Sequence, residues 1–470
     1  MERIPYDEVR FHPHSFADPD GRLFWWKGQL YRGLRSEWAV LFRRLFQEGV
    51  IQRLVDRGLL VETEPTTLNI DGYAMVVRHR PVPFASYPEE WCPSMLRDAA
   101  LAILELLIEL APCGLTLKDS HPWNLLFDLS RPVYVDLTSI TLIQDAGTWP
   151  GYEEFCRFYL YPLILMAHKE DRIARRLLPE YEGVSKADLF RLTRRTQYSM
   201  LPSSISSMVG RCADVPRVYA RLRHIGSQFL PARLRTQSNS QQALLAFLEG
   251  IKREIEGITL PAALHAAGLS HDEDVTPSTS PDDAWTAKQR SLYDILTQLR
   301  PDSVLDIGSD TGWYSKLAAL LGSRVVSFDK NLLHTTQLYY AARNKKLPIL
   351  PLVMDFTDPT PSRGLASHWA IAATERFQCD MVMALTLVHQ IVFKRHLNFE
   401  QIVDGLALFS KRWLVVEFAP RENRDVGERR SNTLSWYTLE NFIWSLRRRF
   451  HTVNILPSFP KPRVLLLCEK

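Results

Sequence analysis

The stretch that decides the fold is Val304-Leu-Asp-Ile-Gly-Ser-Asp-Thr-Gly-Trp-Tyr-Ser315, followed by Val325-Val-Ser-Phe-Asp329. Its first residues are apolar and β-branched, which is typical of a buried parallel strand. Its two glycines predict a tight turn whose backbone can approach a ligand, and apolar residues at helical spacing follow. An acidic residue at the end of the second strand of such a unit commonly meets ribose hydroxyls. The stretch therefore predicts a βαβ unit that binds a nucleotide-like ligand.

The glycine turn indicates which ligand. Dinucleotide folds use G-x-G-x-x-G, but here Asp310 stands in place of the second glycine, and Asp306 precedes Gly308 by two residues. A carboxylate there would repel a pyrophosphate, but it suits the cationic amino-acid end of S-adenosylmethionine. The segment resembles the first motif of class I S-adenosylmethionine-dependent methyltransferases. That resemblance implies a cofactor site that includes Asp306, Gly308, Asp310, Gly312 and Asp329, whereas the alternative is a plain βαβ unit with a glycine turn.

The chain beyond Asp329 alternates between helices and strands. We expect further strands at 348–353, 379–384 and 411–418 and a closing pair at 451–456 and 463–468. With the first two, these make seven strands, which is the class I methyltransferase order. The predicted fold class is therefore α/β for this part, a Rossmann-like sheet of seven strands.

The same resemblance assigns roles at the ends of the later strands. It places Asp355 at the adenine amino group, Phe356 over the adenine ring, and Ala384 in the cofactor site. His389 lies five residues beyond the fourth strand, where ligands of open α/β sheets bind, so it is a candidate base for the acceptor proton. The alternative is a helix-start histidine that packs on its neighbours.

A second informative segment is Leu117-Lys-Asp-Ser-His-Pro-Trp-Asn-Leu-Leu-Phe-Asp128, followed by Pro132-Val-Tyr-Val-Asp136. An Asp, an Asn five residues later and a strand-end Asp is the order used by protein kinases and aminoglycoside-type phosphotransferases. Upstream we expect a hairpin at 22–35, a helix from Ser36 to Gly58, two short strands and a helix over 94–110. This order resembles a reduced kinase small lobe in an α+β, largely helical N-terminal domain.

The small lobe departs from the kinase pattern. It has no glycine-rich loop before the hairpin and no lysine on its third strand, because Lys27 falls in a turn and Arg32 stands nearer the expected place. We therefore predict a kinase-like fold without turnover. A phosphotransferase that uses Asp119 as its base and a plain polar loop at Asp119 and Asn124 are the alternatives.

Length and composition set the outer limits. The chain has 470 residues, 46% of them hydrophobic and 23% charged, which fits two or three globular domains. A net charge of +4 is too small to indicate binding to nucleic acid. The six cysteines are scattered, with no C-x-x-C pair and no histidine at the spacing of a metal site. We expect no metal, no membrane span and a cytoplasmic location, while the oligomeric state stays open.

Composition also divides the chain. We predict an N-terminal domain at 1–262, a polar, proline-broken linker at 263–283, and a methyltransferase domain at 284–470. Basic residues gather at 172–195 and 217–235, mostly as solvated helix faces.

The combination is more specific than the class. The Leu117 segment, Asp355-Phe-Thr-Asp-Pro-Thr-Pro-Ser, Ala384-Leu-Thr-Leu-Val-His-Gln and Val416-Glu-Phe-Ala-Pro resemble a bacterial group of methyltransferases with a kinase-like N-terminal region, some of them nodulation-associated. The resemblance implies S-adenosylmethionine as methyl donor and little about the acceptor, which we expect to be a small molecule or a carbohydrate. A phosphotransferase and a non-catalytic binding protein with two degenerate nucleotide folds are the other function classes.

Overall fold

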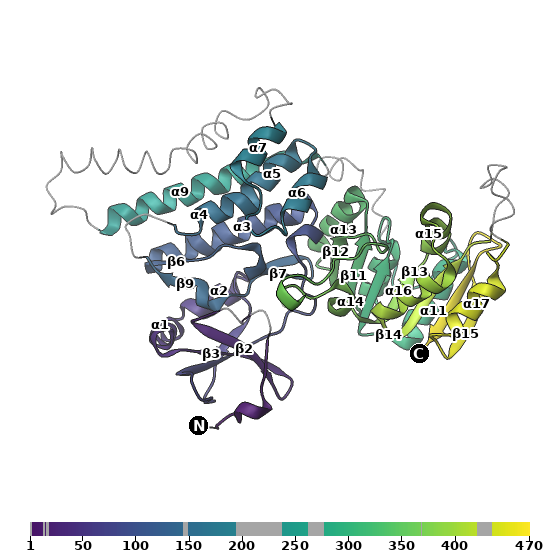
Figure 1. The fold of residues 1–470 in the computed structure, drawn as a ribbon, viewed down its shortest axis with the longest axis horizontal. Helices are drawn as coiled ribbons and strands as arrows, with labels where there is room; N and C mark the ends of the chain where they lie inside the picture. The colour runs from purple at the N-terminus through teal and green to yellow at the C-terminus, as the bar shows by residue number, and fades with distance from the viewer. Residues whose placement is uncertain are drawn as a thin grey trace.

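The computed structural model describes residues 2–12, 15, 18–143, 149–193, 237–261, 277–367, 369–420 and 435–470. A small antiparallel sheet, a body of helices and a larger sheet covered by helices follow one another along the chain (Figure 1). Most of the predicted linker and the basic segment at 217–235 lie outside the described residues.

The first sheet has the order β1-β2-β3-β5-β4, and all its neighbouring strands are antiparallel. In that order the strands are Arg10–Phe11, Gly21–Trp26, Gln29–Leu34, Met75–His79 and Thr63–Pro65. β2 and β3 form the predicted hairpin, whose turn residues Lys27 and Gly28 have φ of 48° and 74°. The single helix predicted next is two helices, α1 (Ser36–Gln47) and α2 (Val50–Asp56), because Gly49 turns into the left-handed region with φ of 71°.

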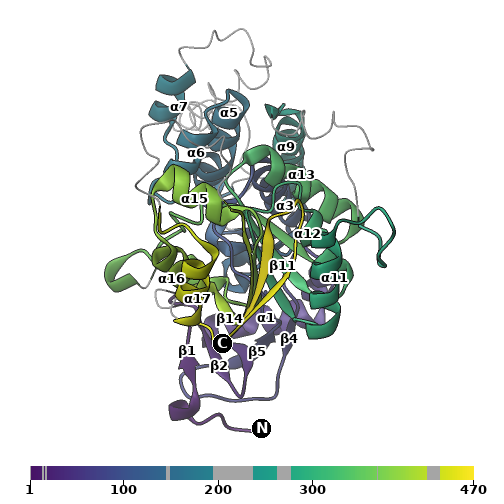
Figure 2. The ribbon, with the colours of Figure 1, turned by 90° about the vertical axis from the view of Figure 1, so that its right-hand side faces the viewer.

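The helical body is built on α3 (Pro93–Leu110), which runs where the sequence predicted a helix and buries most of its side chains. α9 (Gln237–Gly257) packs along it (Figures 1 and 2). The other helices are α4 (Tyr152–Phe155), the π-turn η7 (Cys156–Leu160), α5 (Tyr161–Ala167), α6 (Asp171–Leu177) and α7 (Lys186–Thr193). Two small sheets pair β6 (Leu115–Leu117) with β9 (Ile140–Leu142) and β7 (Leu125–Asp128) with β8 (Arg131–Tyr134). No helix in the described ranges has the length and apolar character needed to cross a bilayer.

The larger sheet has seven strands in the order β12-β11-β10-β13-β14-β16-β15. They are Ile349–Val353, Arg324–Asp329, Ser303–Ile307, Cys379–Ala384, Ser410–Phe418, Val464–Glu469 and Thr452–Pro457. The first five are parallel, and β16 lies antiparallel between β14 and β15. The seven predicted strands are therefore present, and the middle of the sheet is the predicted βαβ unit.

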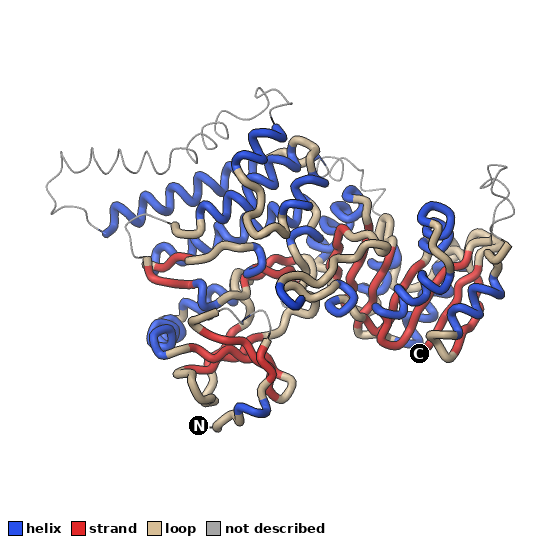
Figure 3. Tube along the Cα trace, viewed as in Figure 1, coloured by secondary structure: helices blue, strands red, loops and turns tan. Residues whose placement is uncertain are grey.

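Helices cover both faces of this sheet (Figures 2 and 3). They are α11 (Ala287–Leu299), α12 (Trp313–Leu320), α13 (Leu332–Lys345), α14 (Ala373–Arg376), α15 (Leu387–Arg395), α16 (Phe399–Phe409) and α17 (Leu439–Arg447). Adjacent strand residues point to opposite faces. Accordingly Val304 belongs to the apolar cluster that includes α11 and α12, and Leu305 to the cluster that includes α16 and α17.

The two halves of the chain share a buried interface. One apolar cluster runs from the helical body into the larger sheet, with the Phe127 ring centroid 5.0 Å from that of Trp91 and 6.1 Å from that of Tyr339 on α13. Beside it, Arg376 binds Glu90 through Nη2–Oε1 and Nη1–Oε2 contacts of 2.5 and 3.1 Å. A buried charge pair between the halves fixes their relative position, because either charge alone would be costly to bury.

Candidate functional site

The turn after β10 has the backbone that its glycines predicted. Gly308 and Gly312 have φ of 73° and 72°, and the Gly308 N–H donates to the Phe328 carbonyl at 2.8 Å. A Cβ added at Gly312 would lie 2.5 Å from Leu338 Cδ1, whereas one at Gly308 would meet its nearest atom, Leu387 Cδ1, at 3.8 Å. Gly312 therefore lets α13 approach, while a Cβ at Gly308 would be in ordinary van der Waals contact, so only the positive φ favours glycine there.

Asp306 lies behind this turn rather than in it. Its side chain is buried in β10, where Oδ2 accepts a hydrogen bond from Ser315 Oγ at 2.6 Å. Burial raises the pKa of this carboxyl to about 6, although the Ser315 hydrogen bond acts in the opposite direction. Asp306 therefore ties the start of α12 to the strand and places negative charge beneath the turn at neutral pH.

Asp329 ends β11 and holds the turn from the other side. Its Oδ2 accepts from the Asp310 N–H at 2.9 Å, and its Oδ1 accepts from the Asn331 N–H at 2.7 Å. His334 Nδ1 lies 3.0 Å from Asp310 Oδ1 and 3.8 Å from Asp329 Oδ2. Asp310 has φ of 51°, a conformation that Asp tolerates better than most residues. Asp310, which replaces the second glycine, therefore helps to hold the turn against Asp329 and His334.

Asp355 follows β12 and meets a partner that the sequence did not predict. Its Oδ1 accepts from the Thr357 N–H and hydroxyl, and Arg395 on α15 lies 2.8 Å from Oδ2. Burial would raise the pKa of this carboxyl, but these hydrogen bonds and the arginine outweigh it and lower the pKa. The neighbouring Phe356 is buried against Phe409 of α16.

These side chains converge on one cavity of about 360 Å³ at the carboxyl edge of the sheet. Five predicted residues line it: Gly308, Asp310, Asp329, Asp355 and Phe356. Other polar and charged side chains that were not predicted from the sequence also line it: Lys330, Asn331, His334, Thr357, Thr386, Gln390, Lys394 and Arg395. Those on α15 recur every three or four residues from Leu387, so the helical period was the signal that could have found them.

The remaining predicted residues lie around the cavity rather than in its wall. Ala384 is buried at the end of β13, two residues before the cavity residue Thr386. His389 lies on α15, with its ring centroid 4.5 Å from Phe393 and 6.2 Å from Tyr437. It contacts an aromatic cluster while its neighbour Gln390 lines the cavity.

The second predicted segment lies between two further cavities. Asp119 and Asn124 line both a cleft of about 470 Å³ under the first sheet and a cavity of about 630 Å³ beside the helical body. In the cleft, Arg32 Nη1 on β3 lies 2.9 Å from Asp136 Oδ1 and 3.0 Å from Asp18 Oδ2. Among the residues that the structure describes, no three His, Cys, Asp or Glu side chains are grouped to hold a metal ion.

No protein-family model matches the chain. Nodulation protein NoeA of Rhizobium meliloti (strain 1021) is 26% identical over 462 residues, 94% of this chain and 92% of NoeA. The predicted resemblance to nodulation-associated proteins is confirmed.

Solved structures show partial likeness. A 2.2 Å crystal structure of WbdD, called a bifunctional kinase-methyltransferase in another structure of it, is 18% identical with a TM-score of 0.29. The match covers 40% of this chain and 41% of WbdD, so this chain spans about two fifths of that protein. Magnesium protoporphyrin IX methyltransferase of Synechocystis PCC 6803, solved with bound SAM, is 15% identical over 38% of this chain and 78% of its own, with a TM-score of 0.27. The fold is therefore described from the strand order of this chain alone.

Proposed function

We propose that the protein is an S-adenosylmethionine-dependent methyltransferase acting on a small-molecule or carbohydrate acceptor. One observation carries the proposal: Gly308, Asp329, Asp355 and Phe356, each predicted from sequence, line a single cavity at the carboxyl edge of the seven-stranded sheet. Ligands of open α/β sheets bind at that edge.

The residues present fit the donor. Asp329 would hold the ribose hydroxyls, Asp355 and Phe356 the adenine, and the turn at 308–312 the amino-acid end, where the charge of Asp306 complements the sulfonium and ammonium. Asp355 must exchange its contact with Arg395 for the adenine amino group. S-adenosylmethionine, when bound, supplies an electrophilic methyl group. The chain's own contribution is then placement of the acceptor beside it.

We propose that His389 takes the acceptor proton. It follows the end of β13, and its neighbour Gln390 is a wall of the cavity. A neutral imidazole can accept a proton from a hydroxyl or an amine as the methyl group arrives.

We propose that the N-terminal half is a kinase-like domain that does not transfer phosphate. Arg32 occupies the third-strand position from which kinases present a lysine, and it pairs with Asp136, the carboxylate that would otherwise hold metal. The role of the N-terminal half is then to support the methyltransferase half across the buried interface.

Calorimetry tests the donor site. S-adenosylmethionine or S-adenosylhomocysteine should bind, and Asp329→Ala should weaken binding by about 1–3 kcal/mol, because ribose hydroxyls would lose their acceptor. Asp302→Ala, an exposed carboxylate before β10, is the matched control and should bind like wild type. Wild-type protein that binds NAD but neither of these ligands would refute the proposal.

A further inference from the structure

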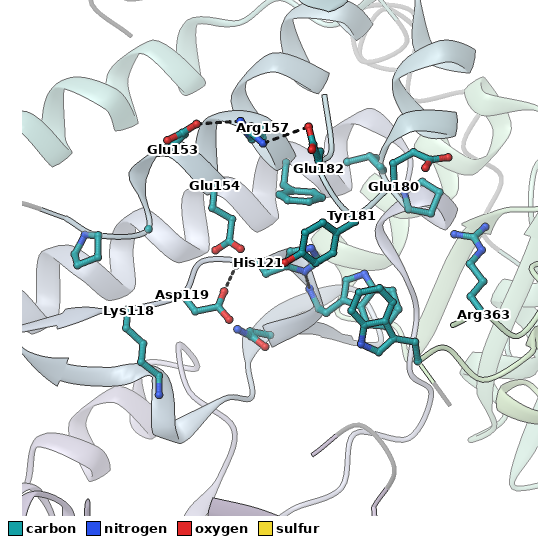
Figure 4. Close-up of a pocket in the computed structure, with 18 residues that line it drawn as sticks. Lys118, Asp119, His121, Glu153, Glu154, Arg157, Glu180, Tyr181, Glu182 and Arg363 are labelled. Carbon is teal, nitrogen blue, oxygen red and sulfur yellow. Dashed lines mark hydrogen bonds and ion pairs between the residues drawn. The ribbon is translucent and has the colours of Figure 1, made fainter. Parts of the chain in front are cut away.

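The cavity of about 630 Å³ lies outside the donor site, where the helical body meets the segment after β12 (Figure 4). Both halves of the chain build it. The N-terminal half contributes the Asp119 loop, the start of α4 and residues 178–182, and the C-terminal half contributes Arg363 and Trp369. A site with walls from both halves exists only in the assembled chain.

Aromatic rings form a row along this cavity. Trp123 stacks on Tyr87 with ring centroids 5.3 Å apart and planes 14° apart, and Trp369 stacks on Tyr181 at 5.9 Å and 18°. Trp123 and Trp369 are 6.0 Å apart, so the two pairs adjoin. Tyr181 is 79% exposed and Trp369 53%, so the outer side of this stacked pair is open to a ligand.

The cavity is lined by five carboxyl groups and three cationic side chains, and several of them are paired. Arg157 lies 3.0 Å from Glu153 and 3.9 Å from Glu182, and Arg363 lies 2.9 Å from Glu89 (Figure 4 shows the Arg157 pairs). The excess of carboxyl groups disfavours a polyphosphate. Because Glu153 and Glu182 are already paired with Arg157, the lining suits a neutral ligand whose hydroxyl groups donate to carboxylates.

Hydrogen-bonding groups of both kinds line the floor. Glu154 is hydrogen-bonded to Asp119, and burial together with that neighbour raises the pKa of Glu154 to about 8. The pair therefore keeps a proton between its two carboxyl groups at neutral pH, and the remaining oxygen lone pairs can accept hydrogen bonds. The Asn124 side-chain nitrogen is buried without a hydrogen-bond partner among the described residues, which leaves one more donor.

We propose that this cavity binds a neutral saccharide. Flat aromatic faces suit the apolar face of a sugar ring, and mixed donors and acceptors suit hydroxyl groups, which both donate and accept. Binding here needs neither the methyl donor nor methyl transfer, so its test is separate from that of the donor site.

The test uses the full chain and ligand-observed NMR. The probes are the tetrasaccharides of glucose, mannose, galactose and N-acetylglucosamine at millimolar concentration, with the glucosamine tetramer as a cationic counterpart. We expect at least one neutral tetrasaccharide to bind. Trp369→Ala and Tyr181→Ala should each weaken that binding about tenfold, the effect of losing one aromatic contact.

Trp444→Ala is the matched control, because Trp444 is 61% exposed on α17 and lines neither cavity. It should bind like wild type, and all three variants should melt near the wild-type temperature because their rings are exposed. The proposal is overturned if no neutral probe binds, if the cationic tetramer binds more tightly than every neutral one, or if both cavity variants bind as well as Trp444→Ala.

Discussion

Among single side chains, His389 has the most direct test. Its ring lies against Phe393 and near Tyr437, so it is a candidate for both proton transfer and packing. If it takes the acceptor proton, His389→Ala should lower turnover by about 10²–10⁴-fold while donor affinity and melting temperature stay close to wild type.

A packing histidine gives a different pattern in the same variant. The melting temperature would fall, and turnover would fall only in proportion to the folded protein that is lost. Measuring turnover, donor affinity and melting together separates the two roles. Full turnover in a normally stable variant would exclude His389 from the chemistry.

Glu154 gives a pH dependence with a definite sign. Its carboxyl pKa rises from 4.5 to about 8 in the folded chain because of burial and Asp119, so the folded state keeps a proton that the unfolded state has released. The contribution of Glu154 to stability must therefore fall as pH rises from about 4.5 to 8. His121 and Asp306, with pKa values of about 4 and 6, act mainly below pH 6.5.

Urea unfolding at pH 6.5 and 8.0 isolates this effect. Wild type should lose at most about 2 kcal/mol over that interval, the linkage of one proton, and Glu154→Gln should lose clearly less. Glu153→Gln, one residue earlier with a side chain 81% exposed, is the control and should keep the wild-type slope. An unchanged slope in Glu154→Gln would contradict the assignment.

At the scale of elements, the contact between β3 and the β8–η6 (Leu137–Ser139) junction bears on the proposal that the N-terminal half is kinase-like and inactive. Arg32 holds Asp136 at 2.9 Å and Thr138 Oγ1 at 2.7 Å, so the carboxylate is already neutralised. We expect no magnesium-dependent ATP hydrolysis above that of Asp119→Asn protein in a coupled phosphate assay. Turnover in wild type that disappears in Asp119→Asn would show an active phosphotransferase.

The elements also show which features of the fold could be predicted from the sequence. The strands around the glycine turn were predictable because apolar runs, glycines and strand-end acids are local signals. The break at Gly49 was not, because an isolated glycine inside a helical pattern is often tolerated. Gly312 was predicted for the ligand, yet its nearest contact is Leu338 of α13, a contact that only the assembled sheet reveals.

The same limit applies to the donor site. Asp329, Asp355 and Phe356 follow strands, and that position is what predicted them for the site. Arg395 contacts Asp355 but lies 40 residues farther along the chain. A contact between residues so far apart in sequence cannot be predicted from the spacing of neighbouring residues. The cavity at Trp369 and Tyr181 was missed for the same reason, because its walls come from both halves.

At the scale of the whole molecule, the interface between the halves links these sites. Polar contacts surround its apolar centre, and three residues make some of them. Arg175 donates to the Glu89 and Val353 carbonyls, Tyr339 donates to Asp98 at 2.7 Å, and Arg376 pairs with Glu90. Glu89 and Val353 also line a further cavity of about 800 Å³. It shares Asp355 with the cavity proposed for the donor and Trp369 with the cavity proposed for the saccharide. Loosening the interface should therefore disturb both sites together.

Arg376 is the contact whose loss should reveal this most clearly. Its side chain is 3% exposed and that of Glu90 1%, and the guanidinium also lies 3.9 Å over the Tyr87 ring. Arg376→Ala leaves Glu90 buried without its partner, so we expect a loss of about 3–5 kcal/mol in the free energy of unfolding.

Arg412→Ala is the control, because that arginine is 61% exposed and lies 3.4 Å from Glu469. It should lower the free energy of unfolding by less than about 1 kcal/mol. Calorimetric melting should show Arg376→Ala unfolding earlier, with donor binding and saccharide binding both weakened at temperatures where the chain is still folded. A variant as stable as Arg412→Ala would mean that the halves are held together by their apolar surface alone.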